Sequence, residues 1–128
     1  MKYKFIIAKK LPSFNEYTNA NRYNRYKGAK MKKDLQSFIR GAIYCQLGKI
    51  KIEKPVIGNF TWIEENRRRD LDNVCYAKKF ILDSLVECGV LKDDNRKMVC
   101  GFRDSFEYGK TAKVIVELEE IEEEDKWK

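Results

Sequence analysis

Hydrophobic residues recur along the chain with two different periods, which predict strands and helices. Near the N-terminus, in the run KYKFIIA, Tyr3, Phe5 and Ile7 alternate with other residues, as in a strand with one buried face. Between residues 28 and 48, apolar residues return every three or four positions, which is the spacing of an amphipathic helix that Gly48 can end. These helical positions are Met31, Leu35, Phe38, Ile39, Ala42, Ile43 and Leu47.

The same two periods continue through the rest of the chain. Residues 56–63 predict a strand with Gly58 as a candidate bulge, and residues 72–88 predict a second helix. Residues 98–103 and 112–118 predict two further strands. The buried side of the second helix is predicted to be Val74, Ala77, Ile81, Leu82 and Leu85. We therefore predict one α+β domain, in which two helices pack on a small mixed or antiparallel sheet of about four strands.

Two segments do not fit either period. Residues 12–27 lack apolar periodicity and are rich in Asn, Tyr and Arg, so we predict a long loop there. Long loops in small domains are usually functional or disordered. Residues 119–128 are mostly acidic, and we predict a solvated C-terminal tail after a domain of residues 1–118.

The uneven charge of the chain suggests a polyanionic partner. The 128 residues carry a formal charge of +7, from 27 Lys and Arg against 20 Asp and Glu. Residues 117–128 hold seven of the acids and two of the lysines, so the first 116 residues carry a net charge of +12. A strongly basic domain favours nucleic acid as a partner, although solubility alone can also explain such a charge.

The absence of histidine and the spacing of the cysteines limit the kinds of catalytic and metal site that the chain can form. The chain has no histidine, which excludes histidine acid–base catalysis and every zinc site that uses histidine. Its cysteines form no CxxC pair, and we expect three of them to be buried free thiols in a reducing cytoplasm. No apolar run approaches the roughly 18 residues of a membrane span, so we expect no membrane partner. The cysteines are Cys45, Cys75, Cys88 and Cys100.

The stretch RRRDLDN, residues 67–73, places three arginines directly before two aspartates. Asp70 and Asp72 point to the same side only where the chain is extended as it enters the second helix. Asp94 lies in the turn after that helix, and an antiparallel return strand would bring it back to this pair. Carboxylates about 5 Å apart repel by roughly 3 kcal/mol per pair, so such a cluster needs a cation. Oxygen ligands favour Mg²⁺ or Mn²⁺, which can activate water for phosphodiester hydrolysis.

Simpler roles exist for these groups. Asp70 or Asp72 can cap the second helix, where an acid is favoured, and residues 92–95 (KDDN) can be an ordinary turn. One polar face of the helix carries Asp72, Tyr76, Lys79 and Asp83. Lys79 can support a phosphate there, or it can form a surface ion pair with Asp83, and the spacing alone favours the ion pair.

Several short motifs together resemble the RusA family of Holliday junction resolvases. That family consists of dimeric, Mg²⁺-dependent endodeoxyribonucleases of phage and prophage origin. The motifs are DLDN at 70–73, LDSL at 82–85, GVLKDD at 89–94 and the early LPSFNEY, and the likeness extends over residues 5–118. The run NRYNRYKGAKMKK resembles a subgroup found in phages of Gram-positive bacteria.

The resemblance implies specific roles for single residues. Three positions match the essential metal-site aspartates of the family, and a fourth matches a further acid in its helix. In this order they are Asp70, Asp72, Asp94 and Asp83. The family lysine stands four residues after the second aspartate of its D-x-D-N motif, where this chain has Tyr76. Counting back from LDSL gives Lys79 for the lysine role, and Lys78 is the alternative.

The same resemblance implies two DNA-binding segments. The arginines before Asp70 would bind strand phosphates beside the cut, and a basic run over residues 22–33 mixes cations with tyrosines that can stack on unpaired bases. The predicted contacts are Arg67, Arg68, Arg69, Arg22, Arg25, Lys27, Lys30, Lys33, Tyr23 and Tyr26, with Lys32 and Tyr17 beside them.

Together these observations predict a homodimeric endonuclease of recombination and repair that resolves four-way DNA junctions by paired hydrolysis. Mg²⁺ is the expected cofactor, Mn²⁺ is expected to replace it, and no small-molecule cofactor is implied. Two alternatives stay open: a non-catalytic basic module that binds nucleic acid, and a Mg²⁺-dependent nuclease for flaps or branched DNA in general.

Overall fold

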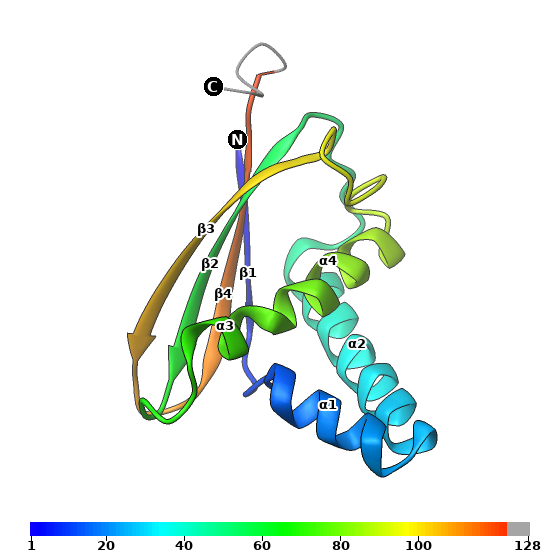
Figure 1. Cartoon of the computed structure of the whole chain (residues 1–128). Helices are drawn as coiled ribbons and strands as arrows, with labels where there is room; N and C mark the ends of the chain where they lie inside the picture. Colours follow the sequence, from blue (N-terminus) through cyan, green and yellow to red (C-terminus); the bar gives the residue numbers. More distant parts are fainter. Residues whose placement is uncertain (123–128) are drawn as a thin grey trace.

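Figure 1 shows a computed structural model of the protein, which describes residues 1–122. A four-stranded sheet, in the order β1-β4-β2-β3, carries the helices on one face. In chain order the elements are β1 (Lys2–Ile7), α1 (Phe14–Tyr23), α2 (Arg25–Leu47), β2 (Val56–Glu64), α3 (Leu71–Val74), a 3-10 helix (Cys75–Ala77), α4 (Lys78–Glu87), β3 (Val99–Tyr108) and β4 (Lys113–Glu120). The predicted α+β domain with a small mixed sheet is confirmed.

The direction of β3 differs from the antiparallel return strand described above. β4 pairs antiparallel with both β1 and β2, whereas β2 and β3 are parallel. Parallel neighbours need a crossover, and the helical segment between β2 and β3 provides it. The antiparallel return strand considered after this segment is therefore wrong. The sheet does contain an irregularity, but it lies between Val56 and Ile57, opposite Cys100, and not at Gly58.

The core lies between the sheet and the helices. From the sheet it takes the alternating positions that the sequence predicts, including Phe5, Ile7, Phe60 and Trp62, each at most 1% exposed. The helices contribute Leu35, Ile39, Ile43, Val74, Ala77, Ile81, Leu82 and Leu85, all buried as predicted. Phe38, one of the predicted apolar positions of this helix, is 42% exposed, and the ammonium of Lys9 lies 5.0 Å from its ring centroid.

The segment 12–27, predicted to be a loop, is helical over most of its length. Ser13 begins α1: its Oγ accepts the backbone N–H of Glu16 at 3.2 Å, and its hydroxyl lies 3.3 Å from the Glu16 carboxylate. These are the residues of a Ser-x-x-Glu capping box. At the other end, Asn24 interrupts the helix and caps α2, because its side chain accepts the N–H of Lys27 at 2.6 Å. The loop prediction was therefore wrong.

Aromatic contacts hold α1 in place. Phe14 meets the ring of Tyr76 edge-on at 5.0 Å between centroids, and Tyr17 meets Phe80 in the same way at 5.3 Å. These contacts fix α1 against the helical segment 71–87, so the domain has three principal helical segments and not two. No helix in the described part of the chain is both long enough and apolar enough to cross a membrane.

The C-terminal strand extends into the predicted acidic tail. Glu119 and Glu120 belong to β4, so the tail boundary at residue 119 was wrong. Hydrogen bonds from Asn59 and Arg103 hold the pKa of Glu119 below its usual value. The remainder of the predicted tail, residues 123–128, lies outside the described residues.

The burial predicted for three of the four cysteines was wrong. Cys45 is exposed, and the other three are partly exposed. Partial burial raises the pKa of the Cys75 and Cys88 thiols above the usual value for cysteine. A neutral thiol is therefore the favoured form of both residues at neutral pH.

Candidate functional site

The loop between β2 and α3 carries the two neighbouring aspartates. Asp70 has an extended backbone, with φ −66° and ψ 149°, and α3 begins at the next residue. Its side chain makes no capping hydrogen bond, so helix capping does not account for it. The carboxylate of Asp72, in the first turn of α3, accepts the N–H of Asn73 at 3.0 Å. Both aspartates are exposed, so their remaining oxygen lone pairs are open to a cation.

Arg69 is part of the fold and is not presented to solvent. Its guanidinium contacts the Glu64 carboxylate through Nε at 2.8 Å and Nη2 at 2.7 Å. It also donates to the carbonyl oxygen of Leu11 at 2.9 Å and pairs with Glu16 at 3.2 Å. The side chain is 14% exposed. Since Arg69 joins the end of β2 to the start of α1, the geometry gives it a structural role in place of the predicted phosphate contact.

The other two arginines of the run remain available to a ligand. Arg67 and Arg68 are both exposed. The guanidinium of Arg67 lies 4.7 Å from the ring centroid of Tyr108, at the end of β3. Two cationic side chains therefore stand within five residues of the exposed carboxylates of Asp70 and Asp72.

Asp94 does not join this pair within one chain. The helical segment 71–87 has a length of roughly 25 Å at 1.5 Å per residue, and Asp94 follows its far end. Because β3 runs parallel to β2, the chain returns to the beginning of β2 and not to its end, where Asp70 and Asp72 lie. Among residues 1–122, no three Asp, Glu, Cys or His side chains are grouped closely enough to hold a metal ion.

Asp94 instead shares a pocket with Asp83. The pocket has a volume of about 280 Å³ and is lined by Lys32, Gln36, Asp83, Val86, Glu87 and Asp94. Lys79 forms an ion pair with Asp83 at 3.3 Å, and the Lys79 side chain is 67% exposed. The surface ion pair with Asp83, which was the alternative to a phosphate-supporting role for Lys79, is therefore present. Of the four predicted acids, Asp83 and Asp94 therefore line one pocket, and Asp70 and Asp72 do not line it.

A partly buried network around Lys78 has no counterpart in the sequence motifs. The Lys78 ammonium lies 2.7 Å from Oδ2 of Asp104 on β3, and the indole N–H of Trp62 donates to Oδ1 of the same carboxylate at 2.8 Å. The Lys78 side chain is 15% exposed and that of Asp104 is 24% exposed. The same ammonium lies 4.1 Å from the ring centroid of Phe102 and 5.2 Å from that of Phe60. Lys78 is thus fixed, whereas Lys79 faces solvent.

The second predicted DNA-binding segment lies at the junction of α1 and α2. Tyr23 and Tyr26 are 75% and 89% exposed, and the Lys27 ammonium lies 4.7 Å from the Tyr23 ring centroid. Tyr17 packs against Phe80 of α4 and is not available in the same way. The exposed bases of this segment are Arg22, Arg25, Lys27, Lys30, Lys32 and Lys33. Figure 1 shows this junction and the β2–α3 loop at the same end of the molecule.

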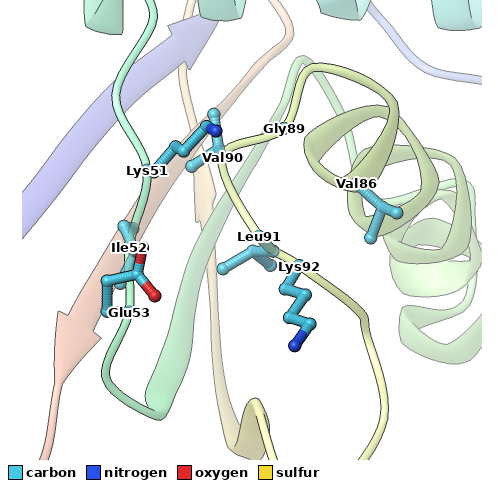
Figure 2. A pocket seen from close by; sticks show the side chains of 8 residues that line it. All are labelled: Lys51, Ile52, Glu53, Val86, Gly89, Val90, Leu91 and Lys92. Atoms are coloured by element: carbon cyan, nitrogen blue, oxygen red, sulfur yellow. The ribbon is translucent and has the colours of Figure 1, made fainter.

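A further pocket, of about 310 Å³, lies away from the aspartate loop (Figure 2). It lies between residues 51–53 and residues 89–92, which are joined by a hydrogen bond from the Ile52 N–H to the Val90 carbonyl at 2.8 Å. Figure 2 shows Lys51 and Lys92 on its border, pointing in different directions. None of the predicted metal or DNA ligands lines this pocket, so it adds nothing to the candidate site.

Comparison with known proteins assigns no family to the chain. No protein-family model matches it, and no curated protein matches it. The likeness to RusA resolvases therefore rests on the DLDN, LDSL and GVLKDD motifs and on the early LPSFNEY segment.

Proposed function

We propose that the protein is a Mg²⁺-dependent endonuclease of the RusA type that cuts branched DNA such as four-way junctions. The observation that carries this proposal is the arrangement at the β2–α3 loop, where exposed Arg67 and Arg68 precede two exposed carboxylates without ion-pair partners in the described chain. Guanidinium groups bind phosphate oxygens strongly, and carboxylates hold hard divalent cations. A phosphate-binding site for the DNA strand and a cation site would thus lie side by side.

Each group of this loop would have a separate task. Asp70 and Asp72 would hold the cation, and their open surroundings suit Mg²⁺, which keeps several water ligands. When bound, the ion would activate water and stabilise charge on the phosphoryl oxygens. Arg67 and Arg68 would bind the phosphates that flank the cut. Lys79 and Lys78 both stay candidates for the lysine that the resemblance implies, since each is ion-paired, Lys79 with Asp83 and Lys78 with Asp104.

The position of Asp94 bears on how many chains form one site. The resemblance implies a dimer with three essential aspartates, and the fold of one chain keeps Asp94 away from Asp70 and Asp72. A site with all three acids would therefore need residues of two copies. In that case, mixed Asp72→Asn and Asp94→Asn copies should recover nicking that neither variant has alone. If each chain formed its own site, the mixture would be as inactive as the separate variants.

The central experiment is cleavage of a synthetic four-way junction in Mg²⁺, with EDTA as the metal-free control. We expect wild-type protein to nick the junction, and Asp72→Asn to keep binding while cleavage falls by orders of magnitude. Glu53→Gln is a matched control, because Glu53 is an exposed acid at the pocket that lies away from the aspartate loop. Normal cleavage by Asp72→Asn would remove the metal-site proposal, since an amide holds a divalent cation far less well than a carboxylate.

The second candidate function is a basic module that binds nucleic acid without cutting it. The separation of Asp94 from the other aspartates favours this alternative. Junction binding with no nicks in Mg²⁺ or Mn²⁺ would support it. Cleavage of flaps as fast as junctions would instead indicate a general nuclease for branched DNA.

A further inference from the structure

The outer strand of the sheet presents a row of side chains on the side that faces the helices. Phe102, Asp104, Phe106 and Tyr108 pair in register with Gly58, Phe60, Trp62 and Glu64 of β2. Directly opposed residues point to the same side of a sheet, so this row continues the surface that the helices cover over β2. β3 is the edge strand, and its main neighbour is β2 (Figure 1). The helices therefore leave much of the row uncovered.

The aromatic rings of this row are exposed and accompanied by cations. Phe102 is 47% exposed and Tyr108 is 50% exposed. The Lys78 ammonium lies 4.1 Å from the ring centroid of Phe102, and the Arg67 guanidinium lies 4.7 Å from that of Tyr108. Six residues of strand separate the two rings, which corresponds to about 20 Å. Phe106 lies between them and is partly exposed.

The charges along the row do not repel a polyanion. Asp104, the acid within it, is already bound by Lys78 and by the indole of Trp62. Glu107 belongs to the alternate set of β3 residues and points to the opposite side of the sheet. At the end of the row, the contact of Arg67 with Tyr108 joins β3 to the loop that holds Asp70. The row is thus continuous with the basic segment of the candidate site.

From this geometry we infer that Phe102, Phe106 and Tyr108, with Arg67 at the end of the row, form a binding site for unpaired bases of single-stranded DNA, which we call the β3 platform. Exposed aromatic rings stack on bases of any sequence, and neighbouring cations bind the backbone phosphates. The site deepens the proposed function and rests on it, because the platform would hold the strand that leaves a branch point beside Asp70 and Asp72. A docking surface for a second copy of the chain is the competing explanation of the exposed rings.

Fluorescence anisotropy in EDTA tests the platform without cleavage. The probes are a labelled oligo-dT of about 20 nucleotides and a blunt duplex of the same length. Loss of one stacking ring should weaken single-strand binding by about fivefold or more, so we expect this for Phe102→Ala and Tyr108→Ala, with less than about twofold change on duplex. Phe38→Ala is the matched control, because Phe38 is 42% exposed and also lies beside a lysine.

The outcomes separate the platform from the nuclease. If wild-type protein binds oligo-dT and both variants bind it equally well, the platform is wrong and the nuclease proposal stands. If the variants lose oligo-dT binding but wild-type protein never nicks a junction, the platform stands and the nuclease proposal fails. Variants that become monomeric by light scattering, while single-strand affinity is unchanged, would show a contact between copies and overturn the platform. Phe102→Leu keeps the apolar contact with Phe60 and controls for misfolding.

Discussion

The Lys78–Asp104 pair should be a measurable source of stability. The two side chains join α4 to the edge strand β3, and they are 15% and 24% exposed. Lys78→Met keeps most of the apolar stem against Phe60 and Phe102 and removes the charge. Asp104→Asn keeps an oxygen that can accept the indole N–H of Trp62 and removes the opposite charge. A double-mutant cycle with these two changes therefore isolates the ion pair.

The expected coupling follows from the burial of the pair. Hydrogen bonds to charged groups contribute about 1.5–3 kcal/mol, while fully exposed ion pairs contribute about 0.2–1 kcal/mol. Since both side chains are mostly buried but not sealed from water, we expect a coupling of roughly 1.5 kcal/mol. Asp104→Asn alone should cost about 2 kcal/mol, because it leaves the Lys78 charge largely buried without its partner.

Urea unfolding followed by circular dichroism measures all four corners of the cycle. The Lys30–Asp34 pair of α2 is a control, since its side chains are 77% and 63% exposed and lie 3.8 Å apart. Its coupling should be no more than about 0.5 kcal/mol. A Lys78–Asp104 coupling no larger than that of the control would refute the argument that burial strengthens this pair, and with it the view that Lys78 is held in place.

Three further outcomes test other parts of the structure. Arg69→Ala should lower the unfolding free energy by about 2–3 kcal/mol in urea titrations, whereas Arg68→Ala should leave it within about 0.5 kcal/mol. Ser13→Ala should cost about 1 kcal/mol, seen as a lower melting temperature, because α1 loses its cap. The lowered pKa of Glu119 stabilises the fold at neutral pH, and this contribution should be lost as the pH falls below the usual glutamate value of about 4.3. Asn59→Ala should reduce that acid sensitivity, and an unchanged pH profile would contradict the assignment.

Much of the fold could be predicted because burial follows a simple period. The alternating residues of the strands and the buried side of the second helix were found in this way, and both were confirmed. The helix α1 was missed because its buried stripe is short and surrounded by polar residues. The Ser-x-x-Glu arrangement of Ser13 and Glu16 is a local signal that could have revealed it. Phe38 belongs to the apolar stripe of α2 but is exposed, because the rest of the domain covers only part of that stripe.

The arrangement of the site was harder to predict, since it depends on strand direction. Whether β3 returns parallel or antiparallel to β2 is decided by packing across the sheet, and this alone determines the position of Asp94 relative to Asp70. The ion pair of Lys78 with Asp104 spans 26 residues and has no local signature. The structural role of Arg69 was hidden for the same reason, because its partners come from the end of β2, from the segment before α1 and from α1.

The place of β4 in the sheet has a consequence for how the protein is made. β1 is synthesised first, yet its strand partner is β4, which is about 110 residues later in the chain. β2 likewise lacks one of its two strand neighbours until β4 has been synthesised. While the nascent chain is still emerging from the ribosome, Phe5 and Ile7 therefore lie on a strand without its neighbour. Closure of the sheet must be a late event, and until residues 113–120 are released the early strand is exposed to chaperones and to aggregation.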